Sequence, residues 1–188
     1  HMSITDNCIP NFPHYFIPHQ CVLRPQSTTT KLRVVFDASS RTSSQISLND
    51  LLMVGPTVQE ELYSTLIRFR FHKFVITADI EKMYRQVLVG DNDRNFQLIL
   101  WRQNPSDSLQ VYRLNTVTYG TSSTPFLAIR CLNHLSANLL TGADSFQELL
   151  TIRDQVTQIL SSAGLNLTKW FSNHPDFNIS NCKEKLLH

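Results

Sequence analysis

Apolar, β-branched segments separated by polar turns recur along the chain and predict β-strands. Residues 21–25 (CVLRP) and 31–39 (KLRVVFDAS) flank the polar turn QSTTT, so we expect them to form a hairpin. Residues 73–80 (KFVITADI) are a strong apolar run and predict a buried strand. Further strands are expected over residues 94–102 and 110–117, joined by the turn NPSDS, and over residues 165–171.

Apolar residues at helical spacing predict three helices. The first is expected from Pro56, a residue favoured at the first helical position, to about Phe69. The second is expected from about Thr124, and the third over residues 146–164, where Gly164 ends it. Helices interleaved with mostly antiparallel strands predict an α+β fold. The apolar face of the first helix would consist of Val58, Leu62, Leu66 and Ile67.

The two ends of the chain carry little periodic signal. His1 and Met2 look like a remnant of cloning, and we leave them out of the expected fold. Residues 3–20 contain three prolines and predict an irregular arm with aromatic anchors. We expect one domain over residues 3–174, followed by a loose tail over residues 175–188. The expected anchors of the arm are Phe12, Tyr15 and Phe16.

Composition is that of an ordinary globular protein, with 188 residues, 41% hydrophobic and 17% charged. There is no apolar run long enough for a membrane span and no visible secretory signal, so we expect an intracellular protein, cytoplasmic or nuclear. A net charge of +2 is small for a dedicated nucleic-acid binder. Four scattered cysteines without a Cys-x-x-Cys pair predict free thiols: Cys8, Cys21, Cys131 and Cys182.

Two local features carry candidate chemistry. Asp79 ends the apolar run of residues 73–80, and nucleic-acid polymerases place a metal-binding aspartate in such a setting. A single aspartate at a strand end is, however, also a common helix cap or surface charge. Lys31 and Arg33 lie on the return strand of the expected hairpin, where charged donors suit phosphate oxygens. An ordinary solvated strand edge is the alternative.

Six segments occur in a fixed order between about residue 15 and residue 174. Taken together they identify a protein family, whereas any one of them alone would be a weak signal. They are STTTKLRVVFDAS, SLNDLLMVGPT, TADIEKMYRQVLV, TYGTSSTPFLAIRCL, LLTGADS and GLNLTKWFSN. Together they resemble the reverse transcriptase of BEL/Pao-type long-terminal-repeat retrotransposons. The resemblance implies the fingers, roughly residues 20–55, and the palm, roughly residues 56–174, of the right-hand polymerase fold.

The resemblance implies nucleotide-binding roles for particular residues. Lys31 and Arg33 match residues that hold the triphosphate of the incoming nucleotide, and Asp79 matches the first metal ligand. Tyr84 matches the residue beneath the sugar. The segment that supports the template and the base corresponds to Tyr119 and Gly120. Basic residues around the Asp79 strand are candidates to line a nucleic-acid groove: Arg68, Arg70, Lys73, Lys82, Arg85 and Arg94.

The family's second metal-binding motif, Tyr-x-Asp-Asp, should lie just before LLTGADS. The sequence there is HLSAN (His134–Asn138), which contains no carboxylate. The resemblance therefore implies that the central palm hairpin is missing and that Asp79 is a lone metal ligand. Neither Asp144, on a different loop, nor Glu81, on the other face of the strand or in the following turn, is expected to replace the lost pair.

Nucleotidyl transfer uses two divalent ions about 4 Å apart, and Mg²⁺ needs carboxylate ligands in near-octahedral geometry. We therefore expect no polymerase activity, no required cofactor and at most weak Mg²⁺ binding at Asp79. The expected function is a protein-interaction module with an unknown protein partner. The alternatives are an RNA- or DNA-binding protein that uses the remnant template groove, and an active RNA-directed DNA polymerase fragment. Strand edges exposed by the missing hairpin also favour a homodimer.

Overall fold

The computed structural model describes residues 1–5, 13–27, 30–135 and 142–177. It divides into two compact units, each built from two segments of the chain. Unit 1 comprises His1–Thr57 and Tyr84–Ala128, and unit 2 comprises Val58–Met83 and Ile129–His188. The division into fingers and palm stays a prediction from the sequence motifs.

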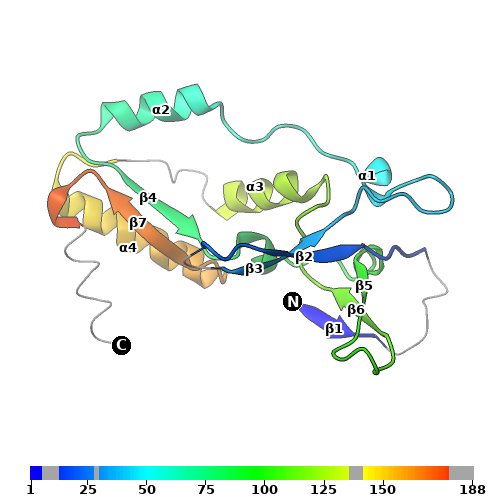
Figure 1. Cartoon of the computed structure of the whole chain (residues 1–188). Coiled ribbons are helices and arrows are strands. Elements are labelled where there is room, and N and C mark those ends of the chain that lie inside the picture. Colours follow the sequence, from blue (N-terminus) through cyan, green and yellow to red (C-terminus); the bar gives the residue numbers. More distant parts are fainter. Residues whose placement is uncertain (6–12, 28–29, 136–141, 178–188) are drawn as a thin grey trace. The chain divides into compact units, whose positions relative to one another are not determined.

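Unit 1 contains a three-stranded antiparallel sheet in the order β1-β6-β5 (Figure 1). The strands are β1 (Met2–Ile4), β5 (Leu98–Trp101) and β6 (Gln110–Leu114). The predicted NPSDS turn joins β5 to β6, and its Asp107 N–H donates to the Asn104 carbonyl over 3.0 Å. The first two residues take part in the fold, contrary to the expectation from the sequence. Met2 pairs with Leu114, and the His1 carbonyl accepts from the Asn115 N–H.

The predicted N-terminal hairpin is present in unit 1. Strands β2 (His19–Leu23) and β3 (Leu32–Phe36) pair antiparallel, with Cys21 opposite Val34. The Arg24 N–H extends the ladder by donating to the Lys31 carbonyl over 2.7 Å. The hairpin predicted from these two segments and the polar turn is confirmed.

The core of unit 1 is built around the arm that precedes β2. Tyr15 and Ile17 are buried with Ala38, Leu48 and Ile99. The Tyr15 hydroxyl donates to the Ser40 carbonyl, and burial raises the pKa of that hydroxyl. The prediction that Tyr15 anchors the arm is confirmed. The arm is more regular than expected, because Ile17 N–H donates to the Leu98 carbonyl over 2.8 Å, beside β5.

Unit 2 is a two-stranded antiparallel sheet with one long helix packed against it (Figure 1). The sheet consists of β4 (Ile76–Ile80) and β7 (Leu167–Ser172), and the helix is α4 (Phe146–Ser162). The prediction of α4 is confirmed. Ser145 and Glu148 form a capping box at its N-terminus, and Gly164 takes a φ of 78° just beyond its C-terminus.

The first predicted helix begins later than expected. Helix α2 covers Leu62–Phe71, so the segment from Pro56 to Glu61 is not helical. The Val58 carbonyl accepts instead from the Asn133 side chain over 3.1 Å, a contact in unit 2 that sequence spacing does not reveal. The apolar side chains of this helix are largely exposed, with Leu62 at 72% and Leu66 at 53%.

Four further elements complete the described part of the chain. Helix α1 (Leu48–Leu51) belongs to unit 1, as does the short 3-10 helix η2 (Arg94–Phe96). The 3-10 helix η1 covers Met83–Gln86. Helix α3 (Thr124–Leu135) begins at the residue that the sequence predicted.

Two sequence expectations for unit 2 need correction. Strand β4 is not buried, since Thr77, Ala78 and Asp79 are all exposed; among the described residues β4 has one strand neighbour, β7. The loose tail predicted from residue 175 does not begin there, because the Phe177 side chain is fully buried with Leu149. Residues 178–188 of that tail lie outside the described residues.

The cysteine prediction holds for the two cysteines that the structure describes. Cys21 and Cys131 are both free thiols. Cys8, Cys182 and the expected anchor Phe12 lie outside the described residues. Within the described ranges, no helix combines the length and the apolar character that a membrane crossing requires.

The burial of Phe177 predicts a stability difference between two phenylalanines of unit 2. Phe177→Ala should lower the free energy of unfolding by about 3–5 kcal/mol, since it leaves a cavity in the core. The control Phe171→Ala removes a side chain that is 64% exposed and should have a much smaller effect. Urea denaturation followed by tryptophan fluorescence measures both. Equal effects of the two substitutions would contradict the packing of Phe177.

Candidate functional site

The candidate metal ligand Asp79 lies on β4 opposite an irregularity in β7. The Cα partners step from Thr77–Phe171 to Asp79–Thr168, so two β7 residues, Lys169 and Trp170, stand opposite one β4 residue. Lys169 has a φ of 53°, in the left-handed region, as expected at a β-bulge. The bulge re-aims the side chain of Lys169.

The bulge brings Lys169 to Asp79. The Lys169 ammonium donates to Asp79 Oδ2 over 2.7 Å, although the two residues are 90 positions apart. The two side chains are 62% and 56% exposed, so the pair contributes little to stability. Its effect is on the chemistry of the carboxylate. One oxygen that a metal ion would use is already bonded to a positive charge.

The two carboxylates weighed as replacements for the lost pair, Glu81 and Asp144, have other neighbours. Glu81 forms an ion pair with its neighbour Lys82 over 2.9 Å. Asp144 follows Ala143, whose backbone pairs with Phe74, five residues before Asp79 on an extended segment. At about 3.3 Å per residue this separates Asp144 from Asp79 by roughly 16 Å, too far to share an ion.

Over the residues that the structure describes, no three His, Cys, Asp or Glu side chains are grouped to hold a metal ion. The region in which the resemblance places the missing motif is only partly described. His134 and Leu135 are the last residues of α3, and residues 136–141 lie outside the described ranges. The predicted loss of the central palm hairpin therefore rests on the sequence.

The nucleotide-binding-like residues are divided between the two units. Asp79 belongs to unit 2, whereas Tyr84 is a half-buried residue of η1 at the start of the second segment of unit 1. Lys31 and Arg33 project from the β2–β3 hairpin of unit 1, and both are exposed.

Unit 1 brings Tyr119 and Gly120 against β3. The Tyr119 hydroxyl donates to the Val34 carbonyl over 2.7 Å, and its ring meets that of Phe36 with centroids 5.3 Å apart. Gly120 has a φ of 100°, and a Cβ there would collide with the Phe36 carbonyl oxygen. Glycine is required at this position by both constraints. Arg33 is therefore on a strand to which this segment is directly bonded.

Asn49 is a structural contributor that the sequence reasoning missed. Its side-chain Nδ2 donates to Ser39 Oγ over 2.8 Å and to the Gly120 carbonyl over 3.1 Å. Its Oδ1 accepts from Ser122 N–H over 2.8 Å. One amide thus joins α1 to the turn after β3 and to the loop before α3. The one available signal was its position within SLNDLL, between the two residues of a capping pair.

That capping pair is Ser47 and Asp50, which flank the first turn of α1. Asp50 Oδ2 accepts from the backbone N–H and the hydroxyl of Ser47, and Ser47 Oγ accepts from Asp50 N–H. The hydrogen bonds from Ser47 lower the pKa of the Asp50 carboxyl. The pair fixes the short helix, and with it the position of Asn49.

Half of the six candidate groove residues are engaged by acidic neighbours. Arg68 forms an ion pair with Glu60, and Lys82 with Glu81. Arg94 forms one with Asp91. Arg70, Lys73 and Arg85 are exposed. Arg85 and Arg94 belong to unit 1 and the other four to unit 2, so the six do not form one patch within either unit.

The comparison with known proteins points to one fold. No family model matches the chain. A search of curated proteins also finds no match. Among solved structures, the chain is similar to the foamy viral protease-reverse transcriptase in complex with an RNA/DNA hybrid, with a TM-score of 0.65 and 15% identity. The match covers 83% of this chain, which spans only 20% of the length of that protein.

This similarity shows a reverse-transcriptase-like fold, with helices and antiparallel sheets as the sequence predicted. At 15% identity it shows the fold alone. The BEL/Pao assignment stays a prediction from the sequence motifs.

Proposed function

We propose that this chain is a reverse-transcriptase-like protein that does not polymerise nucleic acid and acts by binding another protein. The observation that carries the first part is the ion pair between Asp79 and Lys169, with 2.7 Å between Nζ and Oδ2. Two-metal catalysis needs carboxylates that face both ions. Here the candidate ligand faces an ammonium group from the neighbouring strand.

Electrostatics explains why the ion pair opposes metal binding. A divalent cation at Asp79 must displace Lys169 or bind beside it. At 4 Å a doubly charged ion and an ammonium group repel by about 2 kcal/mol in bulk water, and screening by salt lowers this to about 1 kcal/mol. The lysine thus supplies the counter-charge of Asp79 in place of a metal ion. The sequence adds a second reason, because residues 134–138 offer no carboxylate.

Exposed apolar side chains support the protein-binding part. Leu62, Tyr63 and Leu66 lie within one stripe of α2, at positions i, i+1 and i+4, and are 72%, 72% and 53% exposed. No residue of α2 is buried. Large apolar side chains gathered on one exposed helix face are typical of protein-interaction sites. A second copy of the chain is the first partner to test, because it presents the same stripe.

The role of Lys169 is tested by metal binding. Lys169→Gln should raise the affinity for Mn²⁺ at Asp79 about five-fold, since it removes a repulsion of about 1 kcal/mol. Paramagnetic broadening of the β4 amide resonances measures this. The control Lys73→Gln makes the same charge change at an exposed lysine without an acidic partner, and should leave the affinity unchanged. Primer extension by the natural sequence with Mg²⁺ or Mn²⁺ would overturn the proposed inactivity.

The role of α2 is tested by light scattering over a concentration series. The natural sequence should exceed the monomer mass of 21.6 kDa, and the double variant Leu62→Ser, Leu66→Ser should return it to that mass, because it removes the shared apolar stripe. The control Leu88→Ser changes a leucine of unit 1 that is 70% exposed and should not alter association. A monomer at all concentrations would exclude a second copy as the partner.

Binding to a nucleic acid is the second candidate function. It is favoured by the fold shared with a protein solved on an RNA/DNA hybrid. It is opposed by the ion pairs of Arg68, Lys82 and Arg94.

Fluorescence anisotropy with a labelled RNA/DNA hybrid at two salt concentrations separates the two candidates. We expect no binding at micromolar protein, because groove binders depend on clustered free cations. Tight binding that weakens steeply with salt would instead establish the nucleic-acid function. Arg70→Gln and Arg85→Gln would then identify the unit that makes the contact.

A further inference from the structure

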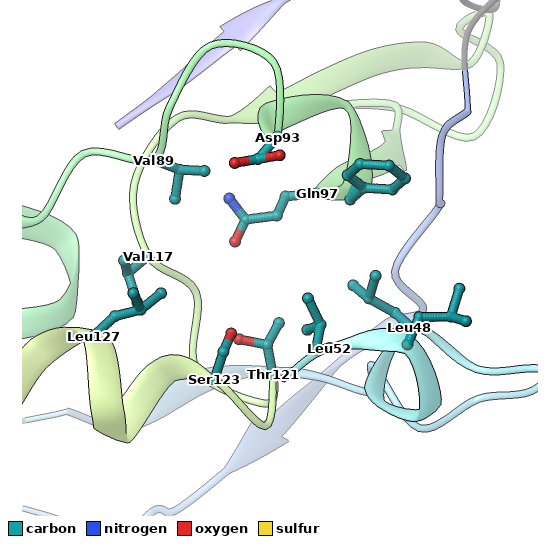
Figure 2. A pocket seen from close by; sticks show the side chains of 11 residues that line it. Leu48, Leu52, Val89, Asp93, Gln97, Val117, Thr121, Ser123 and Leu127 are labelled. Carbon is teal, nitrogen blue, oxygen red and sulfur yellow. The ribbon is translucent and has the colours of Figure 1, made fainter. Parts of the chain in front are cut away.

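Unit 1 contains a cavity of about 300 Å³ that none of the roles above uses. Its wall is mainly aliphatic and aromatic, with four polar side chains, and it is contributed by α1, η2 and the segments around β6 and α3 (Figure 2). Leu51 and Asp93 are exposed, so the cavity opens to solvent. Its volume lies at the lower end of the range for small-molecule sites.

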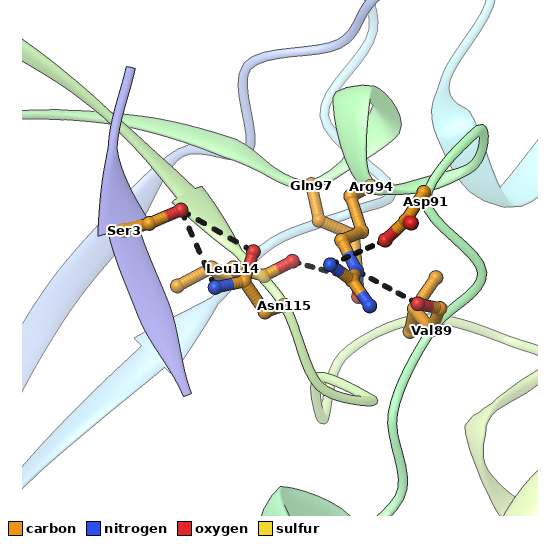
Figure 3. A network of polar contacts seen from close by, with 7 residues as sticks. All are labelled: Ser3, Val89, Asp91, Arg94, Gln97, Leu114 and Asn115. Atoms are coloured by element: carbon orange, nitrogen blue, oxygen red, sulfur yellow. Dashed lines mark hydrogen bonds and ion pairs between the residues drawn. The ribbon is translucent and has the colours of Figure 1, made fainter.

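Gln97 projects its amide into this cavity (Figure 2). The residue is only 6% exposed. Its Nε2 donates to the Leu114 carbonyl over 3.2 Å and to the Thr116 carbonyl over 3.3 Å, and these two bonds fix the orientation of the amide (Figure 3). No residue in the described ranges donates to Gln97 Oε1. This oxygen is thus held in the wall of the open cavity without a donor from the described residues, where it can accept from water or from a ligand.

Asp93 adds a negative charge to the same wall. It stands one 3-10 turn before Gln97, since the Phe96 N–H donates to the Asp93 carbonyl and the Gln97 N–H to that of Arg94. Its carboxylate forms no hydrogen bond or ion pair with a described residue. The nearby Asp91, by contrast, is neutralised by Arg94, whose Nε also donates to the Val89 carbonyl over 2.8 Å (Figure 3).

The scaffold beneath the two acceptors is well fixed. Leu114, which accepts from Gln97, is the last residue of β6 and pairs with β1. Beside it, the Asn115 side chain bonds to Ser3 Oγ over 3.3 Å (Figure 3). The Gln97 amide therefore keeps its orientation, and this part of the cavity wall is set before any ligand arrives.

We propose that this cavity binds a small organic cation with an apolar body, an alkyl- or cycloalkylammonium of about the size of hexylamine. The ammonium donates to Gln97 Oε1 and faces the Asp93 carboxylate, which supplies the charge that a cation needs when it leaves water. The hydrocarbon body packs against the aliphatic wall that includes Leu48, Leu52 and Val117. This site is independent of the proposed function, because it uses neither Asp79 nor α2.

Three probes of equal size and different charge test the assignment. They are n-hexylammonium chloride, 1-hexanol and sodium hexanoate, titrated into the full chain and followed through the amide resonances of unit 1. Hexylammonium should bind saturably and roughly ten-fold more tightly than hexanol, because a charge-assisted hydrogen bond is stronger than a neutral one. Hexanoate should bind more weakly than hexanol, since its carboxylate is repelled by the like charge of Asp93.

Matched variants distinguish binding in this cavity from a general attraction of the cation to negative charge on the protein. Asp93→Asn should remove the preference for hexylammonium over hexanol. Asp107→Asn makes the same charge change in an exposed turn of unit 1 outside the cavity and should leave the preference intact. The assignment is overturned by equal affinity for hexylammonium and hexanol, by an Asp93→Asn variant that keeps the preference, or by no binding at millimolar hexylammonium.

Discussion

The β-bulge in β7 is the constraint on which the chemistry of unit 2 depends. A strand pair without it would alternate its side chains regularly, and the residue beside Asp79 would be set by simple register. The extra residue allows Lys169 to take a left-handed φ and to reach Asp79 Oδ2. Strand β4 thus carries the acidic residue Asp79, while its neighbour β7 supplies the balancing positive charge of Lys169. An exposed pair of this kind changes the character of a site far more than it changes stability.

Unit 1 depends on a different constraint, the close approach of the loop before α3 to β3. Gly120 has no side chain to keep the backbone away from Phe36, and two hydrogen bonds of Asn49 hold the loop in place. The short helix α1 positions Asn49 because Ser47 and Asp50 form a capping box that fixes its first turn. The elements that resemble a nucleotide-supporting segment are therefore also the elements that hold unit 1 together. Their presence alone does not indicate nucleotide binding.

The candidate acceptor groups of the two units differ in whether the chain supplies a partner for them. In unit 2 the candidate metal ligand is neutralised by a lysine of the same chain. In unit 1 an amide oxygen and a carboxylate are left without donors among the described residues, in the wall of an apolar cavity. Unsatisfied acceptors next to an aliphatic wall favour a ligand that is both apolar and positively charged. The ligand chemistry that unit 1 favours is thus different from the triphosphate chemistry suggested by the motifs.

The sequence by itself determined the elements whose signals are local. Turn residues and β-branched strands specified the β2–β3 and β5–β6 hairpins, and a capping box with Gly164 specified α4, because each depends on neighbours within a few positions. It also determined that residues 134–138 carry no carboxylate. Only the tertiary structure decided the start of α2, the exposure of β4, the partner of Asp79 and the open acceptors at Gln97 and Asp93. Each of these depends on groups that are distant in the sequence or on space left between elements, and neither is encoded in a local pattern.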